Sequence, residues 1–72
     1  MGKRSYVMNM EKVKDMMYSR FWTWRVLAEK SNLTETTLMA LQAKRRKASA
    51  RTVYKIAAAL KVKPETLIEK EA

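Results

Sequence analysis

The chain contains no cysteine and no histidine. It therefore has no disulfide framework, no thiolate for a zinc site and no thiol nucleophile. Histidine is the usual metal ligand and the usual acid or base near neutral pH, so its absence argues against both kinds of chemistry. The seven carboxylates are scattered among lysines at helical spacings, which is typical of solvated helix faces. The sequence predicts a protein that is not an enzyme and that binds no metal and no cofactor.

Glycine and proline occur once each. Hairpin turns usually need one of these residues, whereas Ala, Met, Leu, Lys and Glu, which dominate here, favour helices. Long apolar runs are also missing, because none approaches the ~20 residues of a membrane span and the first residues lack the apolar stretch of a signal peptide. We therefore expect an all-α protein that is cytoplasmic and does not associate with a membrane.

The length of 72 residues allows one domain. A chain this short buries only about 60% of its unfolded surface and cannot divide its core in two. We expect residues 1–9 to form an N-terminal arm, either disordered or a short strand, and residues 10–72 to form the folded domain.

Four helix starts share one pattern: an apolar residue, a cap, and a second apolar residue four positions after the cap. This is the hydrophobic staple, in which the two apolar side chains pack across the first turn. The four starts are Trp22-Thr23 to Leu27, Leu33-Thr34 to Leu38, Ala48-Ser49 to Val53, and Val62-Lys63 to Leu67. In the last of them Pro64 occupies the first helical position, which suits its fixed φ. A fifth start lies at Asn9, so the expected helices are 10–20, 24–30, 35–43, 50–60 and 64–70.

These helices predict a compact bundle of five short helices, with any strand confined to the arm. The clearest apolar stripe is Val53, Ile56, Ala57 and Leu60, spaced i, i+3, i+4 and i+7. Phe21 continues the apolar spacing of the first helix. The other residues expected in the core are Val13, Met16, Met17, Val26, Leu27, Leu33, Leu38, Leu41, Val62, Leu67 and Ile68.

The connection between the second and third helices is only three residues long, 31–33. So short a connection makes the two helices cross steeply, as in a helix-turn-helix. The crossing needs a small residue on the second helix, which Ala28 supplies. The turn needs a residue that tolerates positive φ, which Asn32 does.

Two stretches, LAEKSNLTETTL (Leu27 to Leu38) and YKIAAALKVKPETLI (Tyr54 to Ile68), carry a family resemblance. The chain resembles the lambda-repressor and Cro-like helix-turn-helix regulators of bacteria and phages, without a gap from about Val13 to Ile68. In that family the third helix enters the major groove and the second crosses the DNA backbone. The resemblance implies a sequence-specific regulator of transcription that binds double-stranded DNA, a repressor acting by operator occupancy, and a homodimer at least on DNA.

The resemblance also implies which residues contact DNA. The residues expected to contact bases are Thr34, Glu35, Thr36, Thr37 and Ala40. The residues expected to contact phosphates are Thr23, Trp24, Lys44, Arg45, Arg46, Lys47 and Arg51. The charge distribution fits this division, because short polar and methyl groups discriminate between bases whereas cations bind any phosphate. Lysine and arginine supply 16 residues and a net charge of +9, yet none lies between Lys30 and Lys44.

The chain departs from the family at three positions where members commonly have glycine, namely Asn32, Lys44 and Lys61. Positive φ at a lysine costs on the order of 1 kcal/mol, so we expect the loop at Lys44 to have a different shape. Trp24 stands where a phosphate-binding glutamine is frequent, and its indole N–H can still donate.

Alternatives remain for single residues and for the whole chain. Glu35 either accepts a hydrogen bond from cytosine or complements the helix dipole, and Thr37 either contacts a base or packs on the core. The basic loop is either a phosphate site or an ordinary solvated loop. Trp22 and Trp24, among cations, also suit stacking on single strands, although the staple gives Trp22 a place in the core. The whole chain could instead be an antitoxin, another protein-interaction module or an RNA-binding protein.

Overall fold

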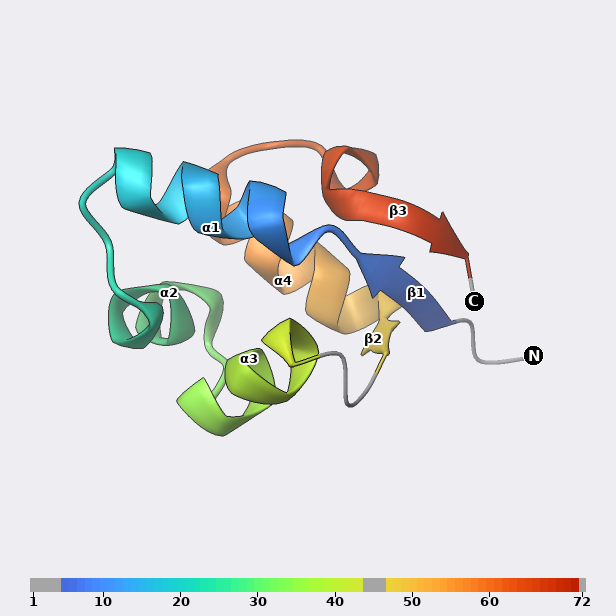
Figure 1. Cartoon of the computed structure of the whole chain (residues 1–72), viewed down its shortest axis with the longest axis horizontal. Helices are drawn as coiled ribbons and strands as arrows, with labels where there is room; N and C mark the ends of the chain where they lie inside the picture. The colour runs from blue at the N-terminus through green and yellow to red at the C-terminus, as the bar shows by residue number, and fades with distance from the viewer. Residues whose placement is uncertain (1–4, 44–46, 72) are drawn as a thin grey trace.

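In the computed structural model, helices make up most of the chain and three short strands lie at one end (Figure 1). The structure describes residues 5–43 and 47–71, without the side chains of the last two. In chain order the elements are β1 (Ser5–Met8), α1 (Met10–Ser19), α2 (Trp24–Ser31), α3 (Glu35–Gln42), β2 (Ala48–Ser49), α4 (Ala50–Leu60), the 3₁₀ helix η1 (Pro64–Leu67) and β3 (Ile68–Glu71).

The predicted helix starts are present, and four of them carry the side-chain cap that the sequence indicated. The caps are Asn9, Thr23, Thr34 and Ser49, each accepting a hydrogen bond from the backbone N–H three residues later, over 3.1, 3.3, 3.1 and 3.2 Å respectively. Lys63 makes no side-chain cap and is followed by Pro64. Each cap satisfies one of the backbone donors that a helix leaves free at its start.

Three helices end in the same way, with a residue other than glycine at positive φ. These residues are Phe21 (61°), Asn32 (58°) and Lys61 (60°). After α1, the N–H of Phe21 donates to the carbonyl of Tyr18 over 2.9 Å and the N–H of Trp22 donates to Met17 over 3.0 Å. This pair of bonds is the Schellman motif. The same pair closes α2 at Leu33 and α4 at Val62.

The Schellman motif and the staple share a residue in each of these connections. Trp22, Leu33 and Val62 follow the residue with positive φ, and all three are partly buried against the core. Each of them also directly precedes the N-cap residue of the next helix. This is the position at which the hydrophobic staple places its first apolar side chain. One apolar residue therefore closes one helix and starts the next, which keeps the connections short.

Replacing Lys61 by glycine should raise the free energy of unfolding by about 0.5–1 kcal/mol, because glycine adopts positive φ without the clash of a Cβ atom. Phe21→Gly should raise the free energy of unfolding by a similar amount, since the Phe21 side chain is 96% exposed and its removal costs no packing. Asn32→Gly is the matched control and should gain less, because asparagine already tolerates this conformation. Urea denaturation followed by circular dichroism measures all three. Equal gains at Asn32 and Lys61 would contradict this explanation.

A three-stranded sheet corrects the all-α prediction. Its order is β2-β1-β3, with both neighbouring pairs antiparallel. Tyr6 lies opposite Ala48 on one side and Glu71 on the other. The prediction that strands are confined to the arm is wrong, because β2 and β3 lie far from it in the sequence. The strands are too short to show an alternating pattern, and each is paired with a distant segment, so local sequence does not reveal them.

The fifth predicted helix, 64–70, is also wrong in part. Only one turn forms, the 3₁₀ helix Pro64–Leu67, and the chain then becomes β3. The N–H of Asn9 donates to the carbonyl of Leu67 over 2.8 Å, and Met8 lies opposite Ile68 in the sheet. Backbone hydrogen bonds with β1 thus replace those that a longer helix would have made. The other helix ends lie within one residue of the predicted ends.

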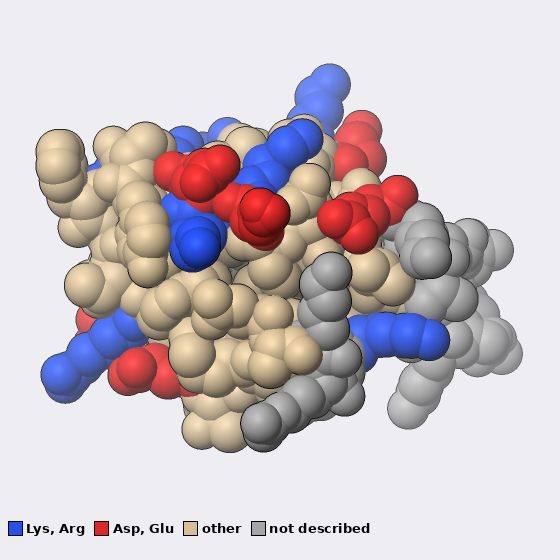
Figure 2. Space-filling view, viewed as in Figure 1, with Lys and Arg blue, Asp and Glu red and all other residues tan. Residues whose placement is uncertain are grey.

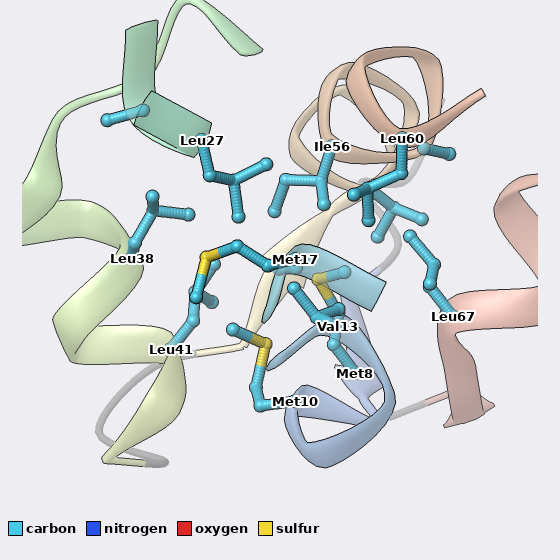
Figure 3. Close-up of a cluster of buried hydrophobic side chains, with 14 residues drawn as sticks. Met8, Met10, Val13, Met17, Leu27, Leu38, Leu41, Ile56, Leu60 and Leu67 are labelled. Carbon is cyan, nitrogen blue, oxygen red and sulfur yellow. The ribbon is translucent and has the colours of Figure 1, made fainter. Parts of the chain in front are cut away.

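The core lies where the four α-helices and η1 converge (Figure 3). The largest fully buried side chains are Met17, Leu27, Leu38, Ile56, Leu60, Leu67, Val13 and Val53, all predicted from the sequence. Met16, Leu33, Val62 and Ile68 are partly buried around them, and Val26 is half-buried. Phe21 is the exception, because α1 ends at Ser19 and the positive φ at Phe21 turns its side chain into solvent.

Candidate nucleic-acid interface

The third helix, α3, packs on the core with one side and leaves the other open. Leu38 and Leu41, which are 0% and 4% exposed, anchor it. The open side is a shallow groove lined by Glu35, Thr36, Met39, Ala40, Gln42 and Ala43. These residues form two adjacent lines, each spaced i, i+4 and i+7, so they share one helix face. The second helix, α2, lies beside α3 (Figure 1).

The open face brings together three of the predicted base-contacting residues. Glu35 and Thr36 are exposed, and Ala40 is half-exposed. Thr36 makes no side-chain hydrogen bond within the part of the chain that the structure describes, so its hydroxyl is available to a ligand. Sequence reasoning did not assign Gln42 and Ala43 to this face. Their position seven residues after Glu35 and Thr36 is the signal that indicates it.

Thr34 and Thr37 are bound to each other. The Thr34 hydroxyl accepts from the N–H of Thr37 over 3.1 Å and donates to Thr37 Oγ1 over 2.9 Å. Because the Thr34 hydroxyl donates its proton to Thr37 Oγ1, it has no proton left for a base. Thr37 is half-buried, which agrees with partial packing on the core, but its own hydroxyl proton is still free to be donated. Of the two threonines, only Thr37 has a hydroxyl proton available to donate to DNA.

The open face of α3 is nearly free of charge. Glu35 is the single charged residue of this helix. In Figure 2 the described surface over α3 is mainly uncharged, and side chains of both signs, Lys and Arg as well as Asp and Glu, lie around it. Glu35 is in the first turn, where a carboxylate also complements the helix dipole. Both readings of Glu35 are therefore compatible with its position.

Two predicted phosphate-binding cations lie beside the short strand β2. Lys47 precedes β2 and Arg51 is the second residue of α4, and both are exposed. Since β2 pairs with β1, the sheet fixes the backbone between these two cations. Lys44, Arg45 and Arg46 lie outside the described residues.

Arg51 does not complement the dipole of its own helix. It lies in the first turn of α4, which contains no acidic residue. The N-terminus of a helix carries partial positive charge, so a cation there is unfavourable by a few tenths of a kcal/mol up to about 1. Arg51 is therefore an exposed cation at an electrostatically unfavourable position of its own helix.

The remaining predicted phosphate contacts, Thr23 and Trp24, lie at the start of α2. Thr23 is exposed and its hydroxyl caps the helix. Trp24 is half-buried and packs against the core. Only part of the Trp24 side chain is therefore open to a phosphate.

Trp22 is held in place by cations rather than offered as a free stacking platform. Its ring is partly buried against the core. Lys30 Nζ lies 5.0 Å from the ring centroid, and the Arg20 guanidinium lies 5.9 Å from it. Arg20 also donates to the carbonyl of Met16 over 2.8 Å and to that of Leu60 over 3.0 Å. These contacts join the ends of α1 and α4, so the geometry favours a structural role for Trp22.

Two further features bear on other kinds of site. Within residues 5–43 and 47–71 no group of three or more metal-binding side chains lies together. Among the same residues, no helix has the length and apolar character needed to cross a membrane.

Comparison with known proteins identifies one match. A family model described as a Cro/C1-type HTH DNA-binding domain matches residues 12–72. Comparisons with curated proteins and with solved structures found no match.

Proposed function

Because the chain belongs to the Cro/C1-type helix-turn-helix DNA-binding domains, we propose that it is a sequence-specific regulator that represses transcription by occupying its operator. The observation that carries the proposal is the separation of charge around α3. The open face of this helix has one carboxylate, Glu35, whereas the exposed cations Lys47 and Arg51 lie on either side of β2 in the sequence. Uncharged groups suit base reading, and cations at the side suit phosphates.

The proposal places the open face of α3 in the major groove. Glu35, Thr36, Thr37 and Ala40 would meet base edges, with Thr34 acting mainly through its cap. Phosphates would be held by Thr23, Trp24, Lys47 and Arg51, together with the basic residues 44–46. Residues 10–72 would form the DNA-binding domain, with β1 completing its sheet. Repression then needs only occupancy, because a protein bound over a promoter excludes the polymerase.

The proposal includes a homodimer on DNA, with two copies bound to inverted half-sites about 10 base pairs apart. This spacing lets two recognition helices enter the same face of the duplex, one turn apart. Selection of bound sequences from a random duplex library should therefore return a motif with dyad symmetry. A motif without a dyad, protected over less than one turn, would indicate a monomer.

The same selection also tests the proposed function. If the selected pool shows no motif and every duplex binds equally, the protein is a nonspecific polyanion binder. If single strands compete better than any duplex, the result supports the alternative that the protein binds RNA. Competition with a scrambled duplex of equal length and charge is the control, because nonspecific affinity depends on phosphates alone.

One observation favours the alternative of a protein-interaction module such as an antitoxin. Phe21 is 96% exposed and Tyr18 is 52% exposed. They lie on the turn between α1 and α2 and at the end of α1, not on α3. A large exposed apolar side chain held at positive φ benefits neither folding nor solubility. A defined protein partner that binds the wild type but not Phe21→Gly would support this alternative.

A further inference from the structure

We propose that the open face of α3 recognises thymine through its C5-methyl group. The inference rests on the proposed function, because it names the base that this face reads. Its central residues are Met39, Ala40 and Ala43, with Thr36 beside them.

The open face is apolar at its centre, and the fold does not require this. Met39 is 38% exposed, Ala40 is half-exposed and Ala43 is exposed. The core side of α3 is already supplied by Leu38 and Leu41. An amphipathic surface helix normally carries charged or polar residues opposite its core side. Here the centre of that side presents methyl and thioether groups instead. We take this apolar character as a sign that a ligand covers it.

The spacing places these groups in one continuous strip. Thr36, Ala40 and Ala43 follow one another at i, i+4 and i+7, and Met39 lies next to Ala40 and four residues before Ala43. Thr36 has a γ-methyl group as well as a free hydroxyl. The strip is therefore lined by methyl groups along most of the helix.

Thymine is the base edge that such a strip fits. In the major groove, adenine, guanine and cytosine present hydrogen-bond donors and acceptors, whereas thymine also presents its C5-methyl group. An apolar side chain placed against a donor or acceptor removes its water without replacing the hydrogen bond, which is unfavourable. Against the thymine methyl the same side chain excludes water from two apolar surfaces. The strip should therefore select half-sites with thymines facing Thr36, Met39, Ala40 and Ala43.

Uracil substitution isolates this contact, because uracil keeps the hydrogen-bonding edge of thymine and lacks only the methyl group. In a selected duplex, thymines are replaced by uracil one at a time and the dissociation constant is measured. We expect a loss of about fourfold at each thymine that faces the strip, the factor for exposing one buried methyl-sized group. Thymines outside the half-sites are the control and should tolerate uracil without loss.

Two conservative variants assign the effect to the strip. Thr36→Ser removes one methyl group and keeps the hydroxyl, and Met39→Gln keeps the length of the side chain. Both positions are exposed, so the variants should fold, which thermal melting verifies. In each variant the uracil penalty should disappear at one thymine and persist at the others. Lys47→Gln is the matched control, because it should weaken thymine and uracil duplexes equally.

The outcomes separate the two proposals. A sequence preference that uracil never weakens would overturn thymine recognition and leave the proposed function standing. A uracil penalty that is the same in the wild type, Thr36→Ser and Met39→Gln would also overturn it, because the effect would then come from DNA shape. If no duplex is preferred and uracil has no effect, both proposals fail.

Discussion

Replacing Leu38 by alanine should lower the free energy of unfolding by about 2–5 kcal/mol. Leu38 is fully buried, at 0% exposure, and together with Leu41 it fixes α3 to the core (Figure 3). Alanine removes apolar contacts and leaves a cavity that its neighbours fill only in part. Domains of ordinary stability unfold at a cost of about 5–15 kcal/mol, so this change removes a large part of the total.

The neighbouring residue provides the control for Leu38→Ala. Met39→Ala should change the free energy of unfolding by less than about 1 kcal/mol, because Met39 lies on the open side of the same helix. Chemical denaturation followed by circular dichroism compares the two variants. Similar losses at both positions would show that the assignment of the two sides of α3 is wrong.

Arg51→Gln and Thr36→Val should change different properties of DNA binding. If Arg51 holds a phosphate, neutralising it weakens binding to every duplex by a similar factor. The slope of log K against log salt concentration then becomes shallower by about 0.9. If Thr36 meets a base edge, its replacement leaves the salt slope nearly unchanged and alters the preferred base at one or two positions by about 1–3 kcal/mol.

The position of Arg51 in the first turn of α4 sharpens this prediction. A glutamine there removes an unfavourable interaction with the helix dipole, so Arg51→Gln should keep or slightly raise stability while it weakens binding. Anisotropy titrations at several salt concentrations, on a matched and a scrambled duplex, give both signatures. Loss of all binding in Arg51→Gln with no effect of Thr36→Val would favour a nonspecific polyanion binder.

Local sequence predicted the helices because their signals span only a few residues. The caps at Asn9, Thr23, Thr34 and Ser49 each act over three residues, and the staples act over five. The sheet was missed because its signal is not local. Ala48 and Ser49 form a strand only through contact with β1, and the apolar residues at 67 and 68 also fit a helical period.

The residues of the candidate site were likewise predicted where the signal is local, and missed where it depends on the folded structure. Periodicity and the family resemblance placed Glu35, Thr36 and Ala40 on one face, which the structure also shows. The bond between Thr34 and Thr37 could not be read from the sequence, because it depends on side-chain rotamers. Positive φ at Phe21 was missed as well. Phenylalanine rarely adopts it, and the apolar spacing favoured a buried residue instead.

The central place of β1 in the sheet has a consequence for the order of folding. The strands β2 and β3 do not pair with each other, and both depend on β1. Helices form from neighbouring residues within microseconds, whereas β1 must close long loops to reach Ala48 and Glu71. The sheet should therefore form last and open first. Since β2 lies between Lys47 and Arg51 in the sequence, these two cations should reach their final positions only in that last step.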